Sequence, residues 1–307
     1  MHPLVEGILR GDRRSLSRAI SIVDNREPDC HAILGQLFYK TGKAKTVGFT
    51  GAGGAGKSSL IESLVPEFKG LGHRVAVIAV DPTSPITGGA ILGDRIRMRS
   101  IMDDQSVFMR SLASRGATGG ISRSVRNVIR ILDAAGFSLI IVESVGAGQL
   151  EVQISAVVDT TAVVFSPQTG DNIQAIKAGL TEIGDLYIVN KADVAGSSAL
   201  YNSINDFVGD TPRKPKVVMA STKTGEGIKE VADSIKKLLL IKGENYKARE
   251  RRMLEIEVKD IILGMCEDKI SSVLTMDEGY QGYIEKIANK EIDPYFAARE
   301  LAAKVLM

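Results

Sequence analysis

The stretch from Gly51 to Ser58 reads GAGGAGKS and carries the residue types that hold a phosphate group. Its glycines let successive backbone N–H groups turn towards one anion, because glycine accepts conformations that other residues avoid. Lys57 would reach the β- and γ-phosphates of a nucleotide, and Ser58 would ligate magnesium. An apolar VGFT precedes the stretch and a helix-like SSLIESLV continues from its end, which is the context that the pattern GxxxxGK[ST] requires. The predicted phosphate-binding residues are Gly51, Gly53, Gly54, Ala55, Gly56, Lys57, Ser58 and Ser59, with Lys57 also catalytic.

The sequence NKAD, from Asn190 to Asp193, stands at the end of the apolar run DLYIVN. A carboxylate only accepts hydrogen bonds, and guanine offers it two donors on one edge where adenine has no matching pair, so Asp193 would select GTP. We expect the stem of Lys191 to lie along the base plane and Asn190 to connect this loop with the phosphate loop. The later segment ASTKTGEG supplies Ser221 and Thr222 for a backbone contact to the guanine oxygen. Taken alone, NKAD also fits an ordinary surface loop.

Acidic residues at strand ends indicate a metal and γ-phosphate switch. The run LIIVE ends in Glu143, and in the following SVGAGQ the N–H of Gly146 is placed to meet the γ-phosphate. Asp81 ends the run VAVIAVD, and Asp94 lies in the glycine-rich TGGAILGDRIRM. Carboxylates of this kind serve a magnesium shell or orient the attacking water. Asp94 alone is equally well explained as a turn residue, and Glu143 as the cap of a strand.

Six short apolar runs predict the strands that position these loops. They show little polar alternation, which is typical of parallel strands covered on both faces. The stretches between them, such as residues 58–71 and 121–135, have the composition and length of helices. This alternation predicts an α/β fold with a doubly wound, mostly parallel sheet. The runs are TVGFT, VAVIAV, LIIVE, TAVVFS, DLYIVN and KVVMAS.

The pattern of apolar and charged residues divides the chain into three predicted parts. Residues 1–42 have apolar positions at helical spacing and form an N-terminal helical extension, expected as two or three short helices. Residues 43–242 form the nucleotide-binding domain. Residues 243–307 lack strand signals and form a charged helical arm whose apolar residues share one face. Those residues are Leu254, Val258, Ile261, Ile262 and Met265.

Composition excludes several functions. The net charge is +2, from 39 basic and 37 acidic side chains, so no global field favours a nucleic acid or an anionic membrane. The two cysteines, Cys30 and Cys266, are far apart and indicate a reducing compartment without disulfides. The apolar stretch at the N-terminus is too short for a signal peptide, and no run approaches 18 apolar residues, so we expect a cytoplasmic protein. The histidines are scattered, which argues against a transition metal.

These blocks, in this order, resemble the methylmalonyl-CoA mutase-associated GTPases (MeaB/ArgK-like), which belong to the SIMIBI class of P-loop proteins. The resemblance covers most of residues 45–240. It implies magnesium-related roles for Ser58, Asp81, Asp94 and Glu143, and it marks residues 170–177 as a further switch loop, with Lys177 as the first residue to test. The matching segments are VGFTGAGGAGKSS, AVDPTSPITGGAILGDRIRM, ESVGAGQLE, SPQTGDNIQAIKAG and IVNKAD.

The resemblance also implies a biological role. Its members are homodimeric G-protein chaperones with a C-terminal dimerisation arm, which use GTP, GDP and Mg²⁺. They gate cofactor delivery to an adenosylcobalamin-dependent acyl-CoA mutase such as methylmalonyl-CoA mutase, and protect or reactivate it. An alternative is a kinase of a small molecule or of a periplasmic amino-acid-binding protein, for which the sequence shows no acceptor pocket or base. A nickel metallochaperone would need a histidine- or cysteine-rich site, which this chain lacks.

Some residues allow more than one interpretation. Eight arginines lie between Arg95 and Arg130. One of them, Arg97 above all, would be an arginine finger, while most are expected on a solvated or partner-facing surface. Gln149 resembles the water-positioning glutamine of small GTPases but is displaced by an inserted GA. The sequence DCH at residues 29–31 is similar to a cobalamin-binding DxH, yet its context is helical and we expect no direct cobalamin ligation.

Overall fold

A computed structural model gives the fold of the chain. It describes residues 1–81, 98, 104, 106–113, 120–144, 154–168, 183–209, 211, 214–241, 246–276 and 279–306. The chain forms two compact units, Met1–Glu244 and Asn245–Met307, and each is described by itself.

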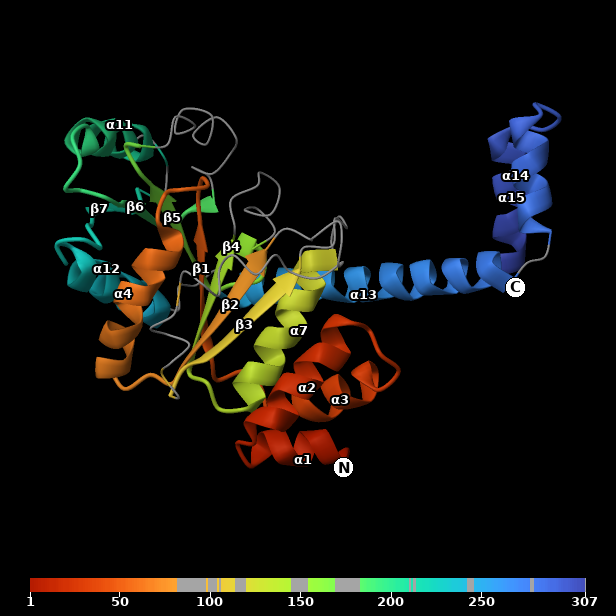
Figure 1. The fold of residues 1–307 in the computed structure, drawn as a ribbon, viewed down its shortest axis with the longest axis horizontal. Helices are drawn as coiled ribbons and strands as arrows, with labels where there is room; N and C mark the ends of the chain where they lie inside the picture. The colour runs from red at the N-terminus through yellow and green to blue at the C-terminus, as the bar shows by residue number, and fades with distance from the viewer. Residues whose placement is uncertain are drawn as a thin grey trace. The chain divides into compact units, whose positions relative to one another are not determined.

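In the first unit, the described residues form a seven-stranded sheet with strand order β3-β2-β4-β1-β5-β6-β7 (Figure 1). Every neighbouring pair is parallel. The predicted α/β fold with a doubly wound parallel sheet is therefore confirmed. The strands are β1 (Lys45–Thr50), β2 (Val75–Asp81), β3 (Phe108–Ala113), β4 (Leu139–Ser144), β5 (Thr160–Phe165), β6 (Leu186–Val189) and β7 (Lys216–Met219).

Strand β3 is the one strand of the described sheet that the apolar runs do not predict. It pairs with β2 alone and so lies at the edge of the sheet. Its middle residues, Arg110 and Ser111, are only partly buried. An edge strand can keep polar side chains, and the uninterrupted apolar pattern of a central strand is then missing.

Helices cover both faces of the sheet (Figure 1). On one face, α4 (Lys57–Gly70) and α12 (Ile228–Leu240) share a buried cluster with alternate residues of the central strands, including Ile141. On the other, α7 (Gly120–Ala134) shares a cluster with the neighbouring Ile140. Successive strand residues point to opposite faces, so this alternation is what a doubly covered sheet requires. Near β6 and β7 lies α11 (Ser197–Gly209).

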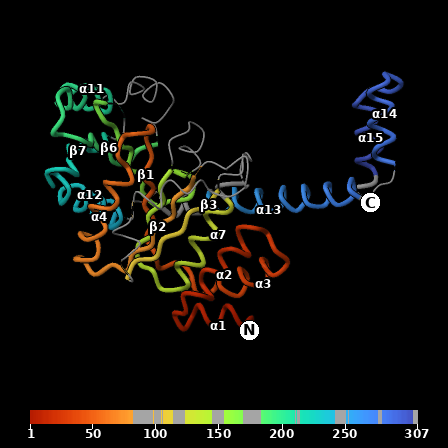
Figure 2. Tube along the Cα trace, in the orientation of Figure 1, coloured from red at the N-terminus to blue at the C-terminus, as the bar shows by residue number. Residues whose placement is uncertain are grey.

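The N-terminal extension forms three helices that belong to the same core as α7. They are α1 (Pro3–Leu9), α2 (Arg13–Asp24) and α3 (Cys30–Phe38), and they lie beside α7 in Figures 1 and 2. The residues that follow them are held by Asp133 of α7, which accepts hydrogen bonds from the backbone N–H groups of Gly42 (2.5 Å) and Ala44 (2.9 Å). The expected short helices are present, and they pack on the sheet unit.

The expectation of a solvated or partner-facing surface does not hold for three of the arginines between Arg95 and Arg130. Arg110 donates to the hydroxyl of Ser21 on α2 at 2.9 Å. Arg126 is buried, and the guanidinium of Arg130 lies 5.4 Å from the ring centre of Phe38. Arg110 and Arg130 join β3 and α7 to the N-terminal helices, which a pattern read along the sequence cannot show.

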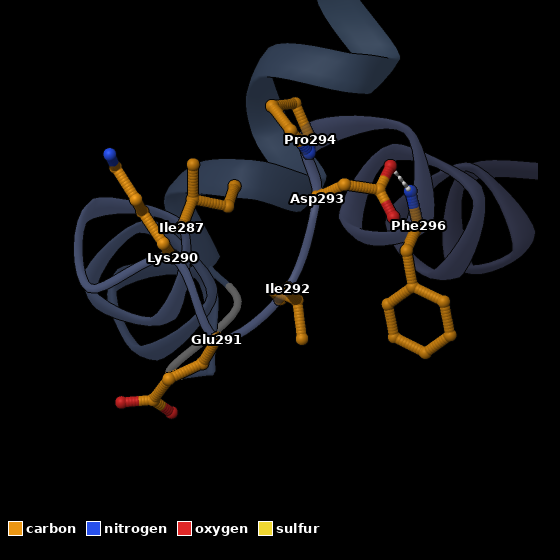
Figure 3. Close-up of a pocket in the computed structure, with 7 residues that line it drawn as sticks. All are labelled: Ile287, Lys290, Glu291, Ile292, Asp293, Pro294 and Phe296. Atoms are coloured by element: carbon orange, nitrogen blue, oxygen red, sulfur yellow. Dashed lines mark hydrogen bonds between the residues drawn. The ribbon is translucent and has the colours of Figure 1, made fainter.

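The second unit is helical: α13 (Tyr246–Met276), α14 (Tyr280–Ala288) and α15 (Pro294–Leu306). The turn between α14 and α15 borders an open hollow of about 620 Å³, lined by Ile287, Lys290, Glu291, Ile292, Asp293, Pro294 and Phe296 (Figure 3). The carboxylate of Asp293 accepts the backbone N–H of Phe296 at 3.0 Å and so caps α15. None of the helices among the described residues is long and apolar enough to span a membrane.

Candidate functional site

The predicted phosphate loop follows β1 at the centre of the sheet, with β4 and β5 on either side. Two of its glycines are required by close contacts and by positive φ angles. A Cβ at Gly51, where φ is 137°, would lie 2.1 Å from the carbonyl oxygen of Val164. A Cβ at Gly56, where φ is 86°, would lie 2.5 Å from Nδ2 of Asn190. No other residue type fits this backbone without displacing β5 or the 190–193 loop.

Lys57 is the first residue of α4 and is only 5% exposed. Its Nζ donates to the carbonyl oxygens of Gly51 (2.6 Å) and Ala52 (3.0 Å). These bonds hold the ammonium group inside the curve of the loop, next to the N-terminus of α4. The cation and the helix dipole both favour an anion at this point, so the loop is built to hold phosphate.

Of the side chains predicted to hold magnesium, Asp81 and Glu143 lie at the ends of the neighbouring strands β2 and β4, and Ser58 lies in the first turn of α4. Ser58 donates from Oγ to Oε1 of Glu143 at 2.7 Å, and both residues are buried. Asp81 is also buried and ends β2, which pairs with β4 in register Ala79↔Glu143. The hydroxyl and carboxylate oxygens at this edge are the ligand type that Mg²⁺ prefers.

The described members of this set would form a metal site together with phosphate. Within the part of the chain that the structure describes, no three His, Cys, Asp or Glu side chains gather to hold a metal ion. Mg²⁺ is commonly held by one or two carboxylates together with the phosphates of a substrate. Ser58, Asp81 and Glu143 therefore fit a metal that arrives with a nucleotide.

Asn190 connects the 190–193 loop to the phosphate loop, as the sequence predicts. Its Nδ2 donates to the carbonyl oxygens of Ala55 (3.0 Å) and Gly56 (3.2 Å). Its backbone N–H donates to the carbonyl of Phe165 at the end of β5, at 2.8 Å. Asn190 is 1% exposed, so these bonds are protected from water and fix the spacing of the two loops.

Asp193 is held by a second loop. The hydroxyl of Ser221 donates to its Oδ1 at 2.6 Å, and Nζ of Lys223 lies 3.9 Å from its Oδ2. The bond from Ser221 is the main reason that the pKa of Asp193 lies below its ordinary value. A lowered pKa keeps the carboxylate ionised and acceptor-only, the state required to receive two donors from guanine. Thr222 is half-buried beside this pair.

Lys191 has a φ angle of 58°, which is unusual for a residue with a side chain. Its Nζ donates to the carbonyl oxygen of Gly54 and to Oε1 of Gln168, both at 2.9 Å. Gln168 was not among the predicted site residues. It lies in the matching segment SPQTGDNIQAIKAG, but no role was assigned to it there, and the strand order is what brings it to Lys191.

Several predicted residues lie outside the described residues: Asp94, Gly146, Lys177, Gln149, Arg97 and the loop 170–177. Their assigned roles stay predictions. The DCH sequence is described, and its helical context is confirmed, since α3 begins at Cys30. Burial raises the pKa of the Cys30 thiol, and His31 is exposed.

Known proteins resemble this chain in sequence and in fold. The family profile described as methylmalonyl Co-A mutase-associated GTPase MeaB matches residues 16–276. A protein from Pyrococcus abyssi is 41% identical over 312 residues, covering 99% of this chain and 96% of the relative. The GTPase ArgK of Escherichia coli K12 is 32% identical over 321 residues, covering 97% of this chain and 96% of ArgK. The crystal structure of an LAO/AO transport system kinase matches in fold with a TM-score of 0.65 at 24% identity, covering 99% of this chain and 97% of that one.

Proposed function

Since this chain belongs to the methylmalonyl-CoA mutase-associated GTPases, the MeaB family, we propose that it is a chaperone of an adenosylcobalamin-dependent acyl-CoA mutase. The chain is a P-loop GTPase. In the proposed role, GTP binding and hydrolysis switch loops that act on the bound mutase, gating delivery of its cofactor and protecting or reactivating it. Methylmalonyl-CoA mutase is the first partner to test. We also propose that the protein acts in the cytoplasm.

We propose the following role for each group of the site. Lys57 and the first amides of α4 neutralise the phosphates, while Asp193 reads the guanine edge beside Lys191. Magnesium would be held by Ser58 and by the carboxylates of Glu143, Asp81 and Asp94, and it would neutralise charge that develops on the transferred phosphoryl group.

One observation supports the switch most directly. The hydroxyl of Ser58 donates to Glu143, the last but one residue of β4, and the segment with Gly146 follows this strand. A lone pair of the Ser58 oxygen would bind magnesium while the hydroxyl proton stays on Glu143, so this bond would couple the arrival of metal and GTP to a change at Glu143. The change would be felt at the end of β4, which is where a γ-phosphate sensor is expected.

The test is to mix the purified protein with a candidate adenosylcobalamin-dependent mutase and to measure GTP turnover and co-purification. We expect slow turnover alone and faster turnover in the complex, because GTPases often gain a missing catalytic group from a partner. A mutase that neither binds nor changes turnover would contradict the chaperone role for that enzyme. Transfer of labelled phosphate to an acceptor instead of water would favour a kinase.

We also propose that the protein is a homodimer joined through residues 243–307. On α13, Leu254, Val258, Ile262 and Met265 follow helical spacing and are between 47% and 58% exposed. A stripe of this kind on one helix normally packs against another helix, and a second copy offers the same stripe.

Sedimentation would test this dimer. Val258→Glu with Ile262→Glu is expected to give monomers, because each change places a charge in the proposed interface. Ser271→Glu, at an exposed polar position of the same helix, is the matched control and should leave the dimer intact. A wild-type monomer at micromolar concentration would refute the dimer without touching the nucleotide assignment.

A further inference from the structure

The strand order places the chain leaving β5 between the two loops that contact a nucleotide. The phosphate loop leaves β1, the 190–193 loop leaves β6, and β5 lies between these strands. The end of β5 touches both loops: the carbonyl of Val164 closes the space beside Gly51, and the carbonyl of Phe165 accepts the N–H of Asn190. Residues directly after β5 are therefore fixed relative to both.

In the described part of this segment, residues 166–168, Gln168 contacts the 190–193 loop by its side chain. Its backbone N–H donates to the hydroxyl of the buried Ser166 at 3.4 Å, which keeps the turn close to β5. Its Oε1 accepts from Nζ of Lys191 at 2.9 Å. An ammonium group only donates, so the amide must present its oxygen here and not its nitrogen.

The ammonium of Lys191 thus joins three loops, since it also donates to the carbonyl of Gly54. A lysine side chain has four flexible bonds, and fixing them costs conformational entropy whenever a ligand requires one arrangement. Two acceptors on separate loops hold its ammonium group in one place before a nucleotide arrives. Such pre-organisation lowers the cost of binding.

We propose that Gln168 is a positioning residue of the guanine nucleotide site, which holds the Lys191 side chain extended for packing along the base. It acts through Lys191 and not on the nucleotide itself. The inference rests on the proposed assignment of residues 190–193 as the base-binding loop. It adds to that assignment a residue from a third loop, through which the chain after β5 is linked to nucleotide occupancy.

The experiment is the dissociation rate of a fluorescent GDP analogue from the full chain, measured by stopped flow. Gln168→Met keeps the length of the side chain and removes the acceptor, and it should speed dissociation by roughly three- to tenfold, the effect of one lost hydrogen bond. Gln168→Glu keeps an acceptor oxygen for Lys191 and should retain the wild-type rate or slow it. Gln168 is exposed, so neither change removes core packing.

Lys191→Met, alone and combined with Gln168→Met, shows whether the two residues act together. If Gln168 acts through Lys191, its substitution has no further effect in the Lys191→Met background. Gln36→Met is the matched control, because that amide also accepts one hydrogen bond, from the N–H of His2 in the N-terminal helices. It should leave the rate unchanged.

The outcomes separate the inference from its premise. If Lys191→Met leaves dissociation unchanged, the base-loop assignment itself is wrong. If Lys191→Met speeds dissociation while Gln168→Met does not, or if the two effects are fully additive, the positioning role of Gln168 is overturned. A Gln168→Glu variant as fast as Gln168→Met would also contradict it, because the acceptor is then irrelevant.

Discussion

The phosphate end and the base end of the nucleotide site are built from different groups. At the phosphate end, glycines with positive φ bring main-chain groups close together, and Gly51 has no room for a side chain. At the base end, side chains hold one another: Asn190 holds the phosphate loop, and Ser221 holds Asp193. At Gly51 and Gly56 the main-chain cage has no room for an added atom, whereas a side-chain network can lose one bond and keep the others. We therefore expect abrupt losses at the first end and graded losses at the second.

The largest effect is expected for Gly51→Ala. Its Cβ would meet the Val164 carbonyl at 2.1 Å, and its φ of 137° is unfavourable for alanine. We expect a loss of about 3 kcal/mol or more in the free energy of unfolding, together with loss of GTP binding. Urea unfolding and titration calorimetry measure the two quantities.

Gly53→Ala sharpens this test within the same loop. No atom lies within 4 Å of a Cβ built at Gly53, so the change in unfolding free energy should stay within about 0.5 kcal/mol. Equal destabilisation by both substitutions would show that close approach to β5 is not what requires glycine at residue 51.

A smaller effect is expected for Asp193→Asn. The amide cannot accept from both guanine donors as a carboxylate does, and GTP affinity should fall roughly 100-fold. Xanthine carries a carbonyl where guanine carries its amino group, so affinity for xanthosine triphosphate should rise in the same variant. Calorimetry with both nucleotides would decide this, and an unchanged preference for GTP would remove Asp193 from the base site.

A smaller loss of nucleotide affinity is expected for Ser221→Ala, which leaves Asp193 in place and removes its hydroxyl partner. Affinity for GDP at neutral pH should fall by about five- to tenfold. Because that hydroxyl is the main cause of the lowered pKa, the substitution should raise the pKa of Asp193 towards its ordinary value.

The pH dependence has a definite sign. The ionised carboxylate is the binding form, so affinity is present above the pKa of Asp193 and is lost as the pH falls through it. In Ser221→Ala the acid loss should begin at a higher pH than in the wild type. GDP titrations from pH 8 down to about 3 would show it, with Ser271→Ala as a control of the same residue type. Coinciding profiles would mean that Ser221 does not tune this carboxylate.

The main-chain end was also the more predictable from sequence. The glycine pattern of residues 51–58 and the buried apolar strands depend on neighbours along the chain, so the loop, the central strands and the parallel sheet followed from local pattern. The link from Asn190 to the phosphate loop followed as well, from a short sequence at a strand end.

Other contacts between distant segments were not predictable in this way. Gln168 contacts Lys191 because β5 lies between β1 and β6. The order of the strands cannot be inferred from the composition of any one strand. Arg110 and Arg130 are ordinary surface arginines by sequence, and they become structural only because α2 and α3 pack beside them. The edge strand β3 was missed because an edge permits polar residues.

The carboxylate of Asp133 has a consequence for how the chain can be shortened. It receives consecutive backbone amides just before β1, and α7 shares its buried cluster with residues such as Ile33 and Leu37 of α3. A protein beginning at Lys45 would leave the Asp133 carboxylate without those donors and would expose the apolar face of α7 to water. Helices α1 to α3 thus belong to the same folding unit as the sheet, and we expect a minimal catalytic fragment to include them.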